Sequence, residues 1–420
     1  MQRHSVEMFK TFFLVTFIFL DLSASSVSSR DGECKISVKN DFPNEKEPFL
    51  LKRDEKGLDF FLPKFENKDD VFHINARDEF YVVCPSRANR LQKTSKPMQK
   101  VSCKGDNVFV VNHEEVTFKT LACQRNVSSS INITSRPCAQ SKGIIVEVGF
   151  QAAGWHSLIK ICHNQTNGLS YYSLHTVRRE LIDGGSYQRS SFRKESKDLF
   201  KDYNPDNYYK KNHQITMLKK IVGDSNVSKY VNNNQFMSRG HLTPVKDLPF
   251  KSWQSFTFGF SNAAPQWQTI NNGAWKKLET AVRDNKQSDV YEVATGTYGV
   301  CKIKDQNGTD VPLSLHAGKI PVPDYFWKLV QDPKDKSCIV FVCTNNPFLD
   351  AQPTPFCSDI CTANNWFVNE NNMQGKAKRA TPNLSQGYMY CCSYSDLKSK
   401  KADLDMPEFK CNGTLKFKSN

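Results

Sequence analysis

Apolar and polar positions follow two different patterns along the chain. From Cys34 to about Cys138, short apolar runs are separated by Pro, Gly, Asn and charged residues, which is typical of short strands joined by turns. The apolar runs after Gly143 are longer and predict buried strands at 143–150, 158–162, 169–177, 290–299, 323–330 and 338–343. Helical spacing predicts helices at 212–222 and 273–283. We therefore expect an α+β protein with a small β-rich module at 27–140 and a larger domain at 141–420. The Ser- and Asn-rich stretch 126–135 is typical of a linker or a glycosylated loop.

The stretch 238–283 holds the residues best suited to cutting a phosphodiester. That reaction needs a base to activate water, a metal ion held by oxygen ligands, and cations that balance the developing charge. The candidates are His241 as the base, Asn271 and Glu279 as oxygen donors, and Arg239 and Arg283 as cations.

The predicted local structure brings these candidates together. An extended segment at 237–243, a half-buried strand at Ser255–Ser261 and the helix at 273–283 would place His241 and Asn271 in one pocket. For His241 alone, a hydrogen-bonded structural role would be the simpler interpretation. Its combination with the neighbouring amides, carboxylate and arginines favours an active site.

This stretch resembles the DNA/RNA non-specific endonucleases, which have a ββα-metal active site. Their signature is Asp-Arg-Gly-His, then Asn-x-x-Pro-Gln, Asn-x-Gly-x-Trp and Leu-Glu, and this chain matches it without a gap from Asn262 to Arg283. The remainder is similar to the secreted insect branch, in particular the salivary nuclease-like proteins of blood-feeding flies such as tsetse. The resemblance implies a central antiparallel sheet in the larger domain.

The resemblance also implies a role for each residue. His241 would deprotonate water, Asn271 would be the one direct protein ligand to Mg²⁺, with Mn²⁺ as the alternative ion, and Glu279 would hold metal-bound water. Mg²⁺ suits such a site because it usually keeps several waters and takes few protein ligands. The phosphate-contacting arginines would be Arg189, Arg239 and Arg283, and the residues that shape the site would be Asn262 and Gln266.

One position departs from the family pattern. The motif opens with Asp in the family and with Ser238 here, which removes a negative charge and keeps a hydroxyl for hydrogen bonding. We expect this change to lower catalysis while nucleic-acid binding survives.

The N-terminal segment and the cysteines predict that the protein is exported. Residues 1–26 have a basic start, an apolar run and small residues, as in a secretory signal, and the run is too short for a membrane span. The fourteen cysteines follow this segment, so up to seven disulfides are expected in a secreted protein, a better interpretation than a metal site at Cys357 and Cys361. Glycosylation sequons start at Asn126, Asn132, Asn164, Asn226, Asn307, Asn383 and Asn412.

The net charge of +14 favours a polyanionic partner. Beside a phosphodiesterase-like site, we expect DNA and RNA as partners, single- or double-stranded and without base specificity, and no membrane. Three hypotheses stay open: a Mg²⁺-dependent endonuclease of reduced activity, a silent nucleic-acid binder, and a secreted binder of heparin-like polyanions with a relic site.

Overall fold

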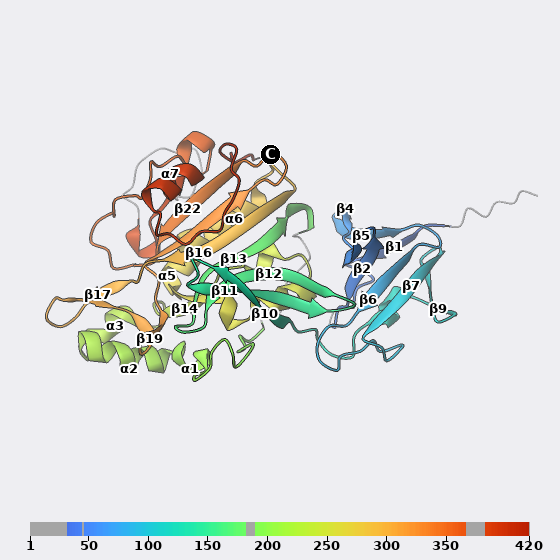
Figure 1. Cartoon of the computed structure of the whole chain (residues 1–420), viewed down its shortest axis with the longest axis horizontal. Helices are drawn as coiled ribbons and strands as arrows, with labels where there is room; N and C mark the ends of the chain where they lie inside the picture. The colour runs from blue at the N-terminus through green and yellow to red at the C-terminus, as the bar shows by residue number, and fades with distance from the viewer. Residues whose placement is uncertain (1–31, 44–45, 182–189, 367–382, 420) are drawn as a thin grey trace, which may run out of the picture.

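The computed structural model describes residues 32–43, 46–181, 190–366 and 383–419, and in this part of the chain two bodies of structure lie side by side (Figure 1). The smaller one contains the N-terminal strands, and the larger one contains the long central strands and all the α-helices. The predicted signal segment and Arg189 lie outside the described residues. No helix within the described ranges combines the length and apolarity that crossing a bilayer requires.

The N-terminal module is built from two antiparallel sheets, as its pattern of short apolar runs predicted. One has the strand order β3-β2-β6-β7-β8-β9 and the other β1-β5-β4. Their bounds are β1 (Cys34–Ser37), β2 (Phe49–Asp54), β3 (Gly57–Phe60), β4 (Lys64–Glu66), β5 (Asp69–Ile74), β6 (Glu79–Val83), β7 (Met98–Gly105), β8 (Val108–Val111) and β9 (Glu114–Val116).

The larger part is organised on one eight-stranded sheet in the order β10-β11-β12-β13-β16-β21-β22-β23. Every neighbouring pair is antiparallel, which confirms the predicted α+β class with a central antiparallel sheet. The strands are β10 (Ser130–Cys138), β11 (Gly143–Gln151), β12 (Trp155–Asn164), β13 (Leu169–Arg178), β16 (Val290–Tyr298), β21 (Tyr325–Gln331), β22 (Cys338–Thr344) and β23 (Met389–Cys392).

Side chains alternate between the two faces of this sheet and supply two cores. Val293, Val330 and Phe341 pack with Trp275 and Leu278 of the site region. The other face packs against the C-terminal helix α7 through residues that include Ala294, Leu329, Val340 and Leu397. The sheet is therefore a buried platform with the candidate site on one side.

Short helices and hairpins surround the sheet. The helices are α1 (Pro205–Tyr208), α2 (Lys211–Val222), α3 (Val227–Tyr230), α4 (Lys251–Gln254), α5 (Gln268–Ile270), α6 (Lys276–Asp284) and α7 (Tyr394–Lys400). The hairpins pair β14 (Met237–His241) with β15 (Ala263–Trp267), β17 (Lys302–Lys304) with β18 (Asp310–Pro312), and β19 (Ser314–His316) with β20 (Lys319–Pro321). Both predicted helices are present, as α2 and α6.

Two local predictions are wrong. Ser255–Ser261 was expected as a half-buried strand, but it forms 3₁₀ turns at Ser255–Thr257 and Phe260–Asn262. The Asn262 side chain donates to the Thr257 carbonyl at 3.0 Å, so a side chain occupies a backbone acceptor that a strand would have paired with a neighbour. The stretch 126–135 was expected to be a loop, but its second half belongs to strand β10, which begins at Ser130 and pairs with β11.

The N-terminal module shares a hydrophobic core with the larger domain. Phe49 of β2 stacks on Trp253 of α4, with ring centroids 5.6 Å apart and an interplanar angle of 8°. The buried carboxylate of Glu47 accepts a hydrogen bond from the backbone N–H of Ser252 at 2.9 Å. The segment between β14 and β15 is therefore packed directly against the module.

Six disulfides form, one fewer than the maximum expected. They are Cys34–Cys103, Cys84–Cys123, Cys138–Cys162, Cys338–Cys411, Cys357–Cys392 and Cys361–Cys391. Cys301 and Cys343 are buried free thiols. Because Cys357 and Cys361 are both oxidised, they do not form a thiolate metal site.

Candidate active site

The β14–β15 hairpin places the first half of the motif on a fixed register. Ser238 is opposite Gln266, and His241 is opposite Ala263. Gly240 is required here, because a Cβ at that position would lie 2.6 Å from Oε1 and 2.7 Å from Cβ of Gln266. The glycine of Arg-Gly-His thus lets the two strands approach while the residues on either side keep their side chains.

Arg239 lies among aromatic rings with its guanidinium held by a carboxylate. Its Nη2 donates to Oδ1 of Asp206 at 2.6 Å, and its Cζ lies 5.4 to 5.8 Å from the ring centroids of Tyr209, Phe260 and Phe192. The side chain remains 30% exposed. A planar cation fixed in this way keeps other N–H groups available for a phosphate.

His241 shares one side of β14 with Arg239, since residues two apart in a strand project in the same direction. Its imidazole packs against Phe192 and Phe258, with centroid distances of 4.8 and 5.1 Å. The residue is only partly buried. The aromatic contacts fix the plane of the ring, and its Nε2 atom is buried.

Asn271 is tied to the same hairpin through Ser238. It starts a π-helical turn at Asn271–Trp275 that leads into α6, and its Nδ2 donates to Ser238 Oγ at 3.1 Å. Ser238 in turn donates to the backbone carbonyl of Gln266 at 2.8 Å. No described residue donates to Asn271 Oδ1, so the carbonyl end of the amide is the end available to a ligand.

The two predicted supporting residues are both fully buried. Asn262 accepts from the Thr243 N–H at 2.9 Å and donates to the carbonyls of Thr243 and Thr257, each at 3.0 Å. Asn262 therefore fixes the backbone just after His241. Gln266 packs under Gly240, and within the described ranges neither of its side-chain amide atoms has a hydrogen-bond partner.

Arg283 belongs to a buried chain of polar groups. Its Nη1 donates to Oδ1 of Asp247 at 2.9 Å, and Oδ2 of Asp247 lies 2.9 Å from Nε2 of His175. The other ring nitrogen of His175 lies 3.2 Å from the Thr243 hydroxyl, two residues after His241. Asp247 thus links the helix of Arg283 to the central sheet and to the strand of the candidate base.

The charged and polar groups around Asp247 keep its carboxyl group ionised. Burial opposes its charge, but the hydrogen bond from His175 and the nearby Arg283 hold the pKa of Asp247 down at about 2. Burial lowers the pKa of His175, although Asp247 opposes that shift, so the imidazole favours its neutral form.

Glu279 faces a buried lysine that the sequence analysis missed. Burial of the carboxyl group raises the pKa of Glu279 to about 7, with Lys328 as the strongest opposing charge, although the residue as a whole is partly exposed. Lys328 of β21 is 1% exposed; its ammonium donates to Thr295 Oγ1 at 2.5 Å and lies 5.4 Å from the Trp275 ring centroid. Two cations, Lys328 and Arg283, therefore stand beside the two carboxylates of Asp247 and Glu279.

The sequence contained one usable signal for these missed residues. Lys328 is the single charge in the apolar strand Tyr325–Val330, and a charge inside a buried strand implies a partner. Asp247 and His175 carry no such signal, because each lies in a segment of mixed polarity and they meet only through the tertiary fold.

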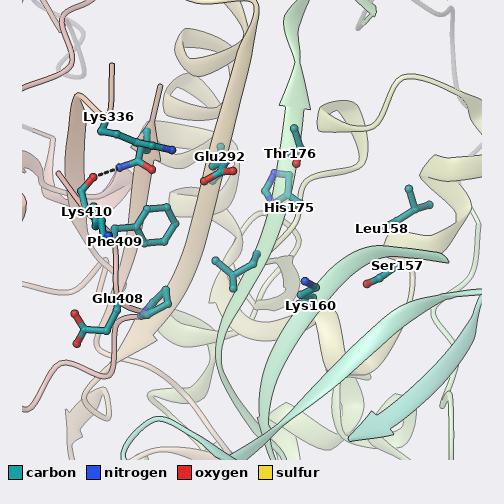
Figure 2. Close-up of a pocket in the computed structure, with 14 residues that line it drawn as sticks. Ser157, Leu158, Lys160, His175, Thr176, Glu292, Lys336, Glu408, Phe409 and Lys410 are labelled. Atoms are coloured by element: carbon teal, nitrogen blue, oxygen red, sulfur yellow. Dashed lines mark hydrogen bonds between the residues drawn. The ribbon is translucent and has the colours of Figure 1, made fainter. Parts of the chain in front are cut away.

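A separate pocket of about 510 Å³ is lined by β12, β13 and β16 and by the segment 407–410 (Figure 2). His175 is part of its lining, but none of the predicted site residues is. Its charged lining residues are Lys160, Glu292, Lys336, Glu408 and Lys410. The pocket is therefore distinct from the candidate active site.

A family comparison agrees with the geometry. Residues 142–397, more than half of the chain, match the family model described as DNA/RNA non-specific endonuclease. The chain belongs to this family. The predicted resemblance and the predicted enzyme class, an endonuclease, are thereby confirmed.

Relatives of this endonuclease include salivary proteins. It is 28% identical to the salivary endonuclease of Lutzomyia longipalpis, over 88% of this chain and 83% of that protein. It is 25% identical to the salivary protein Tsal2A of Glossina morsitans morsitans, over 92% of this chain and 95% of that protein. A solved structure of the EndoG/EndoGI complex is 19% identical, covering 47% of this chain and 76% of that one, with a TM-score of 0.30.

Family membership implies a divalent metal ion, and the residues present fit one. An amide oxygen is a hard ligand of the kind that Mg²⁺ accepts. Asn271 offers such an oxygen, since its nitrogen is engaged by Ser238. The carboxyl group of Glu279 is the acidic oxygen donor of the same helical segment.

Proposed function

We propose that this endonuclease is a secreted, Mg²⁺-dependent enzyme that hydrolyses phosphodiester bonds of DNA and RNA without base specificity. We propose further that its turnover is lower than that of a chain with Asp at position 238. The observation that carries the proposal is the hydrogen bond from Asn271 to Ser238, because it presents the amide oxygen of the candidate metal ligand.

The remaining residues have separable roles in this reaction. His241 accepts the proton of the attacking water. Arg239 Nη2 and Arg283 Nη1 each donate to a carboxylate, and Arg283 Nη2 also donates to Thr280 Oγ1. The remaining Nη group of each arginine contacts phosphate oxygens. Asn271, and Glu279 through water, would hold a divalent ion, which when bound would supply positive charge opposite the charge that develops on the phosphate.

Substrate breadth follows from the kind of contacts proposed. Contacts to phosphate fix the position of a strand but carry no base sequence. The excess of 57 Lys and Arg over 43 Asp and Glu supports association with long polyanions. Extracellular location is supported by the six disulfides and by the salivary relatives.

The alternative is a binder that sequesters nucleic acid with little or no cleavage. Ser238 favours this alternative, since it lacks the carboxylate of the family motif. Binding of heparin-like polyanions would share the steep salt dependence of nucleic-acid binding, so competition between DNA, RNA and heparin separates the two.

The deciding experiment is digestion of supercoiled plasmid and of RNA, with Mg²⁺ and with chelator, alongside a binding titration. We expect slow nicking of both substrates that chelator stops. Binding without any cleavage at high enzyme concentration would favour the sequestering function, and displacement by heparin alone would favour the third hypothesis.

A further inference from the structure

Four aromatic and imidazole rings meet where α1 and α2 face the β19–β20 hairpin, in the part of the molecule that Figure 1 labels α1, α2 and β19. Tyr208 and His316 stack with centroids 4.0 Å apart and an interplanar angle of 23°. His213 meets Tyr208 edge-on at 4.8 Å, and Tyr203 lies 5.3 Å from His316. We call these four residues the ring shelf.

The ring shelf lies at the surface. Tyr208, His213 and His316 are each partly exposed, whereas Tyr203 is buried beneath them. The orientation of His213 is fixed, since its Nε2 lies 2.8 Å from the Leu315 carbonyl. Partly exposed rings in a fixed stack can accept a further flat ring with little loss of conformational entropy.

Cations surround the ring shelf. Lys319 Nζ lies 5.1 Å from the Tyr203 ring centroid, Lys194 Nζ donates to the Tyr203 carbonyl at 2.9 Å, and Lys210 Nζ donates to Asn207 at 3.1 Å. Burial, and then the charges of Lys319 and His213, lower the pKa of His316. Asp202 lies 3.5 Å from Lys319, and its side chain is 80% exposed. The surroundings therefore favour an anion.

The ring shelf is close to the candidate active site. Asp206, which holds Arg239, is two residues before Tyr208 in the single turn of α1. Two residues of chain span at most about 7 Å, so the stacked pair begins beside the carboxylate partner of Arg239. A strand whose phosphate contacts Arg239 would continue past these rings.

We propose that the ring shelf binds an unpaired nucleobase, with Lys319 on the adjoining phosphate, for a single strand that runs through the active site. This proposal rests on the proposed function. Stacked rings beside cations are the usual way in which proteins hold single strands without reading their sequence, because every base has a flat face. It implies a preference for single-stranded substrates or for duplexes with unpaired segments.

Binding measured in chelator tests the proposal without cleavage. The probes are a mixed-sequence single strand, the same strand with abasic sites, and a blunt duplex, each followed by fluorescence anisotropy. We expect His316→Ala to weaken binding of the intact single strand by about tenfold. Binding of the abasic strand and of the duplex should change by less than about twofold, because neither offers an unpaired base.

Three further variants complete the design. His316→Phe keeps a ring and should keep the affinity for the intact strand, and Lys319→Gln should weaken the intact and the abasic strand alike by removing one phosphate contact. The matched control is His73→Ala, which removes a partly exposed histidine from the N-terminal module.

The outcomes separate the two proposals. If His316→Ala loses affinity equally for all three probes, or loses none for the intact strand, the proposed role of the ring shelf is overturned and the endonuclease proposal is unaffected. Failure of the wild-type protein to bind any of the probes overturns the proposed function, and the ring shelf with it.

Discussion

The side-chain nitrogen of Asn271 donates to the hydroxyl of Ser238 at 3.1 Å, so the residue that departs from the family motif touches the candidate metal ligand. A serine at this position still accepts the hydrogen bond, but it brings no charge. We therefore predict that Ser238→Ala lowers the plasmid-nicking rate by up to about tenfold, the value of one neutral hydrogen bond. Ser238→Asp should raise it, because a charged acceptor holds the amide more strongly.

The measurement is the initial nicking rate as a function of Mg²⁺ concentration. Ser238→Ala should require more Mg²⁺ for half-maximal rate, while its thermal unfolding stays close to wild type. Equal rates in the alanine, serine and aspartate forms would mean that position 238 does not limit turnover.

His241→Ala should remove cleavage while leaving binding near wild type. A general base contributes about 10²- to 10⁴-fold, and the phosphate contacts are assigned to other residues. Plasmid nicking and anisotropy measured on the same preparation check both parts. His113→Ala, at an exposed turn of the N-terminal module, is the control. Persistent cleavage in His241→Ala would contradict the assignment of the base.

Lys328→Met should shift the acid limb of the pH–rate profile to higher pH. Lys328 opposes the burial that raises the pKa of Glu279 to about 7, so its removal lets that pKa rise further. Glu279 must be ionised to hold metal-bound water, and activity is lost as pH falls through its pKa. The check is kcat/KM measured against pH. A uniform loss of activity with an unmoved profile would indicate a role in packing alone.

His163 makes the fold sensitive to acid. Burial lowers its pKa from the ordinary 6.5 to about 4, and its ring nitrogens lie 3.0 Å from Ser170 Oγ and 3.4 Å from the Leu199 carbonyl. The unfolded chain therefore binds the proton more readily, and stability falls as pH drops from about 6.5 towards 4. We expect a loss of about 2 kcal/mol between pH 7 and pH 5 from this group.

Urea unfolding at the two pH values measures this effect. His163→Gln should be less stable than wild type at neutral pH, yet lose about 2 kcal/mol less between pH 7 and pH 5. A variant with the same pH dependence as wild type would place the acid sensitivity in other groups.

Trp253→Ala should destabilise the protein by about 3–5 kcal/mol, because a buried indole leaves a large cavity. Its ring stacks on Phe49, so the cavity opens at the contact between the N-terminal module and the segment that carries Asp247. We expect the loss of activity on warming to begin at a lower temperature than in wild type. Unchanged unfolding would show that the module packs too loosely to support the site.

Local patterns predicted six of the eight strands of the central sheet, all but β10 and β23, and both helices, since burial on a sheet and on a helix leaves different spacings of apolar residues. The alternation at Ser255–Ser261 was misleading. Almost all of that segment is buried, but its backbone is satisfied piecemeal: the Thr257 carbonyl accepts from the Asn262 side chain, and Phe258 and Phe260 bond to the backbone of Arg193 in an isolated bridge.

The site could be predicted only as far as the motif extends. His241, Asn271 and Glu279 are close in sequence and carry the family spacing. Asp247 and Lys328 are 81 positions apart in numbering, and they come close because Asp247 bonds to His175 of β13 in the same central sheet that carries Lys328 on β21. Contacts between distant segments do not change the spacing of apolar residues within either segment, so the sequence pattern does not predict them.

The disulfides leave a long uncrosslinked interval, since none of the six involves a cysteine between positions 162 and 338. The hairpin of His241 and the helix of Glu279 both lie in this interval. Thiol reagents would therefore loosen the outer parts of the molecule and leave the catalytic segment dependent on noncovalent packing alone. During synthesis, the first three crosslinks can close before that segment has emerged from the ribosome.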